Sequence, residues 1–434
     1  MTTLLHLPIE IASLIFTHLG PGDWLSLRKT CKEINARTAH LFTDRFFKTR
    51  FVMFERKSLE CLEEITNHRA LGQSVEELEI CVSHLLPLNE LQDIEPPYSE
   101  YENMMKRIKG RTPYDEWGPS DDEGGMSDED IEESPGDHLS QVNAREYRKR
   151  FDDQERVIRT GYDIECLTRA MTHLKRCKRI NISSSVRTWG LNRLRRSTGI
   201  LPQRSVTFES QESTRLVHHI IHAVLTAAAA SQIQVEVLDI GVGSMTENAN
   251  RISANMLTGP SSAILAESPL VSLHRLCICL DPNVPKCIPA SSKWENDLVH
   301  FIKLLPELSY LELQFDERDY LDGRFSGLSK ELYIPKLETL TLSCIDCAGV
   351  DLAFFLIRHH RTLREVVLDA IQLTGDAADW RWLVEIIRDS LDLTCFSIMS
   401  SDTREGARFI NLNDIEVTDA QGLTEVIDML TAKA

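Results

Sequence analysis

The sequence predicts a mixed α/β protein in which three short N-terminal helices precede an irregular solenoid of parallel strands and outer helices. Two observations carry this prediction. The first 45 residues hold short apolar segments separated by Gly and Pro, and a six-residue apolar pattern then recurs along the chain. Because each unit of a solenoid buries its apolar face against its neighbours, a recurring pattern of this kind predicts stacking.

The N-terminal segment has the spacing of short amphipathic helices. Pro8 suits a first helical turn, and apolar residues then recur at intervals of three and four at Ile11, Leu14, Ile15 and Leu19. Gly20 and Pro21 end this helix, Asp23 begins a second one, and a third helix includes Cys31 and Ile34. Three helices of this length bury little apolar surface, so a partner is physically plausible.

The recurring pattern consists of an apolar residue, two others, an apolar residue, one other and a final apolar residue. It occurs at 75–80, 177–182, 235–240, 273–278, 308–313, 337–342, 363–368 and 393–398, and the last six starts lie 26 to 38 residues apart. Segments with helical periodicity precede later copies at 294–305, 350–360 and 379–391. One strand and one helix per repeat is therefore expected.

Charge and cysteine content exclude several classes of protein. The formal net charge of −18 argues against general binding to nucleic acid or an anionic membrane. No apolar run approaches the length of a membrane span, and Glu10 interrupts the apolar N-terminus, so neither a membrane anchor nor a signal peptide is expected. Eleven cysteines without a dense framework suggest reduced thiols in the cytosol or nucleus.

Composition also divides the chain. Eleven acidic residues and no Lys or Arg lie between Asp115 and Asp137, a composition typical of a disordered insertion. A basic segment with helical periodicity follows at 144–159. We therefore expect an N-terminal domain at 1–45, the start of a repeat domain at 46–92, an acidic insertion at 93–143 and the rest of the repeat domain at 144–434.

Several positions over about forty residues agree in order and spacing with a known family. They are the Leu7-Pro8-x-Glu10 start, the Ile15-Phe16-x-x-Leu19 helix end, the Pro21-x-Asp23 turn and the Leu27-x-x-x-Cys31-Lys32 run. Together they resemble the F-box. Thr30 and Ile34 depart from it, since the family usually has an aliphatic residue and a Trp there. The later pattern resembles degenerate leucine-rich repeats. The amino-acid sequence of its C-terminal part resembles the C-terminal region of fungal F-box proteins.

The resemblance implies a non-catalytic, substrate-recognising subunit of an SCF-type cullin-RING ubiquitin ligase. The F-box would bind a Skp-type adaptor, which connects to the cullin scaffold. The residues expected at that contact, some of which would instead form the core of the helical unit, are Leu7, Pro8, Ile11, Ile15, Leu19, Trp24, Leu25, Leu27, Arg28, Cys31 and Lys32. A scaffold role outside a ligase is the alternative.

The strands would then hold a protein substrate, whose identity the sequence does not contain. Side chains of a strand alternate between faces, so residues between the apolar positions point outward. The expected substrate-facing residues are Arg179, Asn181, Asp239, Arg275, Tyr310, Glu312, Gln314, Thr341, Glu365 and Asp369.

The sequence offers little for an enzymatic function. The strand at 235–240 followed by Gly241 and Gly243 is similar to the start of an S-adenosylmethionine site, but Met245 stands where a third Gly is expected. His218 and His222 are one helical turn apart without a completing ligand, and Cys344 and Cys347 lack a second pair. No cofactor or metal is therefore expected.

Overall fold

The computed structural model describes residues 7–91, 143–184, 191–200, 202–243, 250–267, 270–281, 293–315, 325–374, 377–405, 408–412 and 415–433. These residues form two compact units, which are described separately. Unit 1 comprises Met1–Cys177, Ser185–Arg204 and Met245–Asn248, and unit 2 comprises Lys178–Ser184, Ser205–Ser244 and Ala249–Ala434. The expected acidic insertion at 93–143 lies outside the described residues except for Asn143, and the predicted domain boundaries remain predictions.

Unit 1 begins with the three expected short helices. It contains α1 (Ile9–Thr17), α2 (Pro21–Thr30), α3 (Lys32–Phe47), β1 (Thr49–Met53), α4 (Arg56–Asn67), α5 (Arg69–Gly72), β2 (Glu77–Cys81), α7 (Ala144–Arg159), α8 (Tyr162–His173) and α9 (Leu191–Thr198). β1 and β2 pair in parallel. The helix expected at 144–159 is confirmed as α7. The second helix begins with Pro21 at its first turn after the cap residue Gly20, so the expectation that Asp23 begins it was wrong.

Unit 2 alternates strands with helices. It contains β3 (Arg179–Ser183), α10 (Gln211–Ser231), β4 (Val237–Gly241), β5 (Ile252–Ser253), the 3-10 helix η4 (Ala254–Leu257), α11 (Pro260–Glu267), β6 (Arg275–Asp281), α12 (Trp294–Lys303), β7 (Tyr310–Phe315), α13 (Phe325–Glu331), β8 (Thr339–Cys347), α14 (Gly349–Arg358), β9 (Glu365–Thr374), α15 (Ala377–Ser390), β10 (Cys395–Met399), β11 (Ser401–Glu405), β12 (Arg408–Leu412), β13 (Ile415–Val417) and α16 (Ala420–Lys433). Each of the eight copies of the apolar pattern, one of which lies in unit 1, overlaps a strand that begins at the third residue of the copy.

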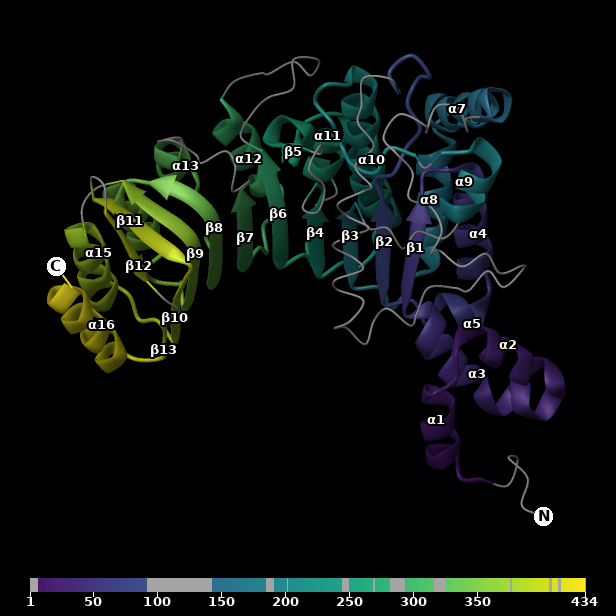
Figure 1. Ribbon diagram of the computed structural model, residues 1–434, viewed down its shortest axis with the longest axis horizontal. Helices are drawn as coiled ribbons and strands as arrows, with labels where there is room; N and C mark the ends of the chain where they lie inside the picture. Colours follow the sequence, from purple (N-terminus) through teal and green to yellow (C-terminus); the bar gives the residue numbers. More distant parts are fainter. Residues whose placement is uncertain are drawn as a thin grey trace. The chain divides into compact units, whose positions relative to one another are not determined.

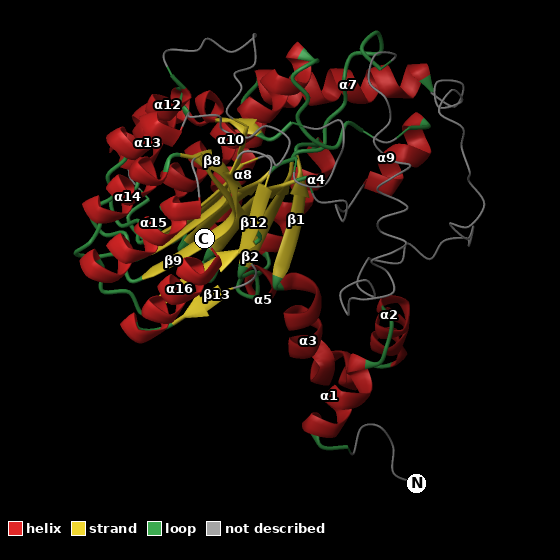
Figure 2. Ribbon diagram, turned by 60° about the vertical axis from the view of Figure 1, so that its left-hand side comes forward, coloured by secondary structure: helices red, strands yellow, loops and turns green. Residues whose placement is uncertain are grey.

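The main strands of unit 2 pair in the order in which they occur along the chain. β3, β4, β6, β7, β8, β9 and β10 form a parallel series, in which each strand pairs with the next. Figure 2 shows α12, α13, α14 and α15 following one another along one side of the sheet. Apolar residues of the pattern, such as Leu311, Leu340 and Val366, are fully buried beneath these helices. This arrangement leaves the outward residues on the other face of the strands.

The C-terminal end of unit 2 departs from the parallel pattern. β13 pairs antiparallel with β10, and β12 pairs antiparallel with β11, which itself runs parallel to β9. The final helix α16 packs against α15. Its apolar residues Leu423, Val426, Ile427 and Leu430 are all buried. These elements, seen at the yellow end of Figure 1, cover the last parallel strand.

Three neighbouring strands share one backbone irregularity. Cys344, Ala370 and Ser400 have φ values of 61°, 49° and 44°, and each follows directly after residues paired at one level, Ser343, Asp369 and Met399. We refer to these three residues as the kink line. In β9 the buried residues on either side of the kink line, Leu368 and Ile371, are three residues apart instead of two. The left-handed residue Ala370 therefore shifts the alternation of side chains by one position.

Within the described residues, no helix is both long and apolar enough to cross a membrane.

Candidate functional site

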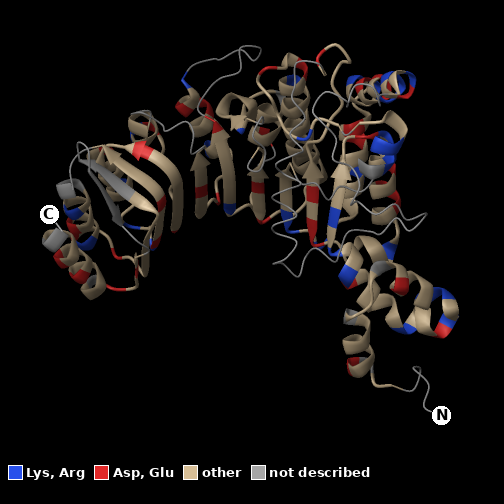
Figure 3. Ribbon diagram, in the orientation of Figure 1, with Lys and Arg blue, Asp and Glu red and all other residues tan. Residues whose placement is uncertain are grey.

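The first helix carries apolar side chains on two faces. Ala12 and Phe16 are 3% exposed and pack into the core of the three-helix unit. Ile11, Leu14 and Ile15 are 45%, 62% and 39% exposed on the other side of the same helix. Figure 3 shows α1 almost without charge, apart from Glu10. A helix that is apolar all round is normally buried all round, so this outer face is suited to a partner.

Trp24 organises the core beneath that face. It is 1% exposed, and its indole Nε1–H donates a hydrogen bond of 2.8 Å to the carbonyl of Phe16. The ring centroids of Phe16 and Trp24 are 5.2 Å apart, and Phe42 and Phe46 of α3 close the cluster. The aromatic cluster therefore fixes α1 and α2 against α3.

Arginine side chains connect the helices through hydrogen bonds to the groups of other helices or of the N-terminal segment. Arg37 donates to the Leu7 carbonyl at 2.6 Å and Arg45 donates to the Phe16 carbonyl at 2.8 Å. Arg28 donates to the Asn35 side-chain oxygen at 2.8 Å and lies 3.6 Å from the ring centre of Phe42. Burial lowers the pKa of Arg28 from its ordinary value. Arg28 thus has a structural role within the unit.

The structure separates the expected adaptor-contact residues into three groups. Exposed residues are Pro8, Ile11, Ile15, Leu25, Cys31 and Lys32; half-buried residues are Leu7, Leu19, Leu27 and Arg28; only Trp24 is buried. Trp24 therefore belongs to the core, the alternative that the sequence left open for the apolar members. Leu14 is 62% exposed, more than the other described apolar side chains of α1, and was not among the expected contact residues, although its helical spacing had been recognised.

Local hydrogen bonds explain two positions near the start of α3. The Cys31 sulfur accepts from the backbone N–H of Ile34 at 3.5 Å and caps the helix. Thr30 donates its hydroxyl to the Leu27 carbonyl at 2.7 Å, at the end of α2. Thr30, a departure from the F-box pattern, therefore satisfies a backbone group at a helix end.

Unit 2 presents a second candidate surface on its strands. Register places Arg275, Tyr310, Thr339 and Glu365 at one level, and the level two residues further on contains Asn181, Asp239, Cys277, Glu312 and Thr341. The next level contains Gln314, Ser343 and Asp369. All ten expected substrate-facing residues are half-buried or exposed, so the alternation expected from the pattern is observed.

A polar network occupies the centre of this surface. The Arg275 guanidinium lies 3.9 Å from the ring centre of Tyr310 and 3.5 Å from a carboxylate oxygen of Glu312. The Tyr310 hydroxyl donates to the same Glu312 oxygen at 3.0 Å. Burial raises the pKa of Cys277 to about 12, with the Glu312 and Asp239 carboxylates adding to the shift, so its thiol stays protonated. The network holds three side chains in place on a largely polar face.

The turn after β4 has a packing explanation. Gly243 has a φ of 83°, and a Cβ at this position would lie 2.1 Å from the backbone oxygen of Asn250. Its N–H donates to the Ser184 hydroxyl at 2.9 Å. β4 also pairs with β3 and β6, its neighbours in the sequence order of main strands. Doubly wound cofactor-binding sheets instead reverse strand order at the ligand, so this geometry does not favour the S-adenosylmethionine alternative.

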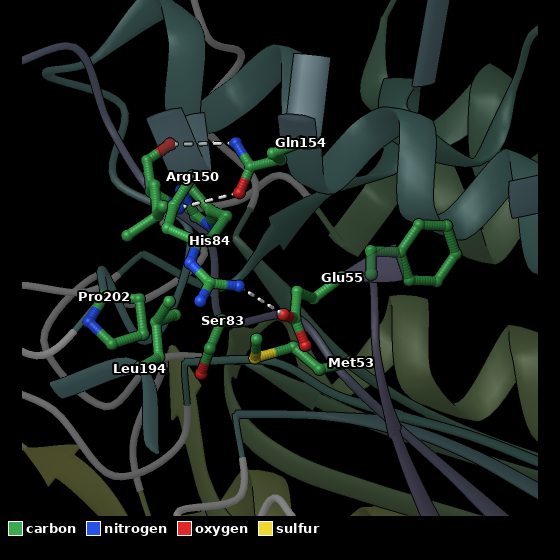
Figure 4. A pocket seen from close by; sticks show the side chains of 10 residues that line it. Met53, Glu55, Ser83, His84, Arg150, Gln154, Leu194 and Pro202 are labelled. Carbon is green, nitrogen blue, oxygen red and sulfur yellow. Dashed lines mark hydrogen bonds and ion pairs between the residues drawn. The ribbon is translucent and has the colours of Figure 1, made fainter. Parts of the chain in front are cut away.

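A very small pocket, partly open to solvent, lies within unit 1. Figure 4 shows Glu55 facing Arg150, whose guanidinium lies 3.3 Å from the carboxylate. Arg193 donates to the same carboxylate at 3.0 Å. Gln154 donates to the Leu85 carbonyl and accepts from the Leu85 N–H, at 3.0 and 2.9 Å. These side chains connect elements of unit 1, which indicates a structural role for the pocket.

The histidine pair of α10 is internal. The Nε2 atoms of His218 and His222 are 2.7 Å apart, and His222 Nδ1 is hydrogen-bonded to the Ser261 hydroxyl. Burial lowers the pKa of His222 to about 3. Within the part of the chain that the structure describes, no three His, Cys, Asp or Glu side chains are grouped to hold a metal ion.

Comparison with known families identifies a domain in the N-terminal part of the chain. The F-box domain model matches residues 4–38, which include α1, α2 and the first two turns of α3. No curated protein matches the chain.

Proposed function

We propose, from the F-box domain at residues 4–38, that this chain is the substrate-recruiting subunit of an SCF-type cullin-RING ubiquitin ligase. In this role the F-box binds a Skp-type adaptor, the adaptor connects to the cullin, and unit 2 holds a protein substrate. The chain itself contributes proximity, which raises the effective concentration of the substrate near the ubiquitin carrier, and no catalytic residue. It would act in the cytosol or nucleus.

The observation that carries the proposal is the outer apolar face of α1. Ile11, Leu14 and Ile15 remain exposed after the aromatic core has formed. A few buried apolar anchors carry most of the affinity of a protein interface, and these three residues lie together on one helix face. Leu25 of α2, 46% exposed, adds a fourth apolar side chain on the neighbouring helix.

Substitution of Leu14 by Asp tests the adaptor contact. A carboxylate placed in an apolar interface would be desolvated without a partner. We expect the adaptor affinity to fall by roughly 30-fold or more, equivalent to about 2 kcal/mol for one anchor residue. Binding of purified Skp-type adaptor to wild type and variant would be measured by calorimetry, and Leu7→Ala with Pro8→Ala would be a milder second variant.

The matched control is Val271→Asp, because Val271 is 56% exposed but lies in unit 2. It should leave adaptor binding unchanged. Adaptor affinity that is equal in Leu14→Asp and wild type, with α1 still helical by hydrogen exchange, would refute the contact. Adaptor binding without the cullin would favour the scaffold alternative.

We further propose that unit 2 is an irregular leucine-rich-repeat solenoid whose outward strand residues bind the substrate. The series of parallel strands in sequence order, each joined to the next through helical segments, supports this assignment. Tyr310→Ala with Thr341→Ala would remove two adjacent side chains from the face. Proximity labelling in cells should then lose specific neighbours while adaptor and cullin are retained; an unchanged set of neighbours would exclude these positions.

A further inference from the structure

The outer side of unit 2 carries an exposed apolar stripe on α14. Val350, Phe354 and Ile357 are 66%, 48% and 39% exposed and follow at the spacing of one helix face. Tyr333, just before β8, and Trp382 of α15 are also 49% and 40% exposed. The outward face of a helix on a sheet is normally polar, so this stripe needs a different explanation.

The exposed apolar area of the stripe is large enough for a protein contact. An aromatic side chain offers about 200 Å² and an aliphatic one somewhat less, so Val350, Phe354 and Ile357 at these exposures present on the order of 300 Å². Exposed apolar patches of this size on monomers often mark an interaction surface. A stripe this small fits a weak or transient contact better than a permanent one.

Opposite charges flank the stripe at matching distances from its centre. Asp351 accepts a hydrogen bond of 3.2 Å from Ser326 of α13, and Arg358 donates to the Ser329 carbonyl of α13 at 3.2 Å. Both therefore lie on the flank of α14 that faces α13. Seven residues are about two turns, or about 10 Å, so these charges lie above and below Phe354 on the same flank.

We propose that a second copy of this chain docks on the stripe, with the two α14 helices antiparallel about a two-fold axis beside Phe354. The two-fold operation keeps the charged flank on the same side and reverses its direction. Asp351 then faces Arg358 of the partner subunit, and the reciprocal pair forms at the other end. The antiparallel arrangement also places opposite ends of the two helix dipoles together.

The alternative arrangements are less favourable. Two parallel α14 helices about a two-fold axis would lose the Asp351–Arg358 pairing and bring like ends of the dipoles together. An unrelated apolar helix would cover the stripe but would have to supply its own matched charges. The self-complementary order of Asp351, Phe354 and Arg358 is what favours a second copy over another protein.

Self-association would be measured by sedimentation equilibrium on the full chain bound to its adaptor, over roughly 1 to 100 μM. A monomer–dimer equilibrium is expected for wild type. Phe354→Glu should raise the dissociation constant at least tenfold because a carboxylate would lie beside its own copy at the axis. Val271→Glu, an equally exposed position outside the stripe, should leave it unchanged.

Charge reversal distinguishes this geometry from a non-specific apolar contact. Asp351→Arg alone should weaken the dimer, and Asp351→Arg combined with Arg358→Asp should restore it, because both reciprocal pairs are then rebuilt in reverse. Thermal melting would check that each variant is folded. A chain that stays monomeric at every concentration, binding of another protein to the stripe without self-association, or no rescue in the folded double variant would each overturn the proposal.

Discussion

Three residues at one level of the sheet of unit 2 occupy backbone conformations that favour glycine. Cys344, Ala370 and Ser400, the kink line, have positive φ values, and a side chain in this region costs on the order of 1 kcal/mol. No sequence rule could foresee them, because none is Gly or Asn. Their position is determined by the neighbouring strands, which must all step at the same level to keep Leu368 and Ile371 in the core.

Glycine at the kink line should therefore stabilise unit 2. Ala370→Gly removes the Cβ from a residue at φ 49°, and we expect the free energy of unfolding to rise by up to about 1 kcal/mol. Ser397→Gly, in the regular part of β10, is the matched control and should lower stability by a similar amount. Denaturant unfolding of both variants would measure the difference; stabilisation by neither or by both would contradict the argument.

The His218–His222 pair should make unit 2 sensitive to acid. Burial first, and then the charge of His218, lower the pKa of His222 to about 3, while the unfolded chain has the ordinary value of about 6.5. The unfolded state therefore binds more protons between these values, so stability falls as pH decreases from about 6.5 towards 3. This contribution is at most about 1.4 kcal/mol per pH unit.

Replacement of His222 by Gln removes this titration. The variant should show a shallower loss of stability between pH 6.5 and 4 than wild type, measured as the pH dependence of thermal unfolding. Its absolute stability at neutral pH is not diagnostic, because the hydrogen bond to Ser261 also changes. Equal slopes in the two proteins would show that His222 is not the group responsible.

At the scale of elements, the strands of unit 2 were predictable and its helices partly so. The alternation of apolar residues such as Leu311, Leu313 and Phe315 predicts which face of a strand is buried. α10 is buried over most of its length, including a run of alanines, so it lacks the polar face that reveals a surface helix. β13 and α16 were missed because their role depends on the strand that they cover.

The N-terminal helices illustrate the same limit at the candidate site. The spacing of Ile11, Leu14 and Ile15 predicted a helix but not which apolar residues face the core. Trp24 and Phe16 select the inner face through a side chain to backbone hydrogen bond between residues of different helices. That choice depends on tertiary packing, so the sequence left open whether Trp24 lies in the core or at the contact, and it did not identify Leu14 as exposed.

For the whole molecule, the C-terminal cover should determine whether unit 2 stays soluble. Deletion of residues 413–434 removes β13 and α16, exposing the edge of β10 and the apolar side of α15. The solenoid proposed for unit 2 would need such terminal elements, and an open strand edge promotes association. We expect loss of soluble protein or aggregation in size-exclusion chromatography, whereas removal of Ala434 alone should have no effect; a soluble, monomeric truncation would contradict this.

The kink line also has a mechanical consequence. In a solenoid such as the one proposed for unit 2, units normally separate one at a time, because each contacts only its neighbours. Here β8, β9 and the start of β11 remain paired in matched register beyond the kink line. When one of these strands detaches, its neighbour therefore loses the backbone pairing that holds its own kink in place. Under a force applied at the C-terminus, the last three strand-helix units of unit 2 should therefore unfold in one step.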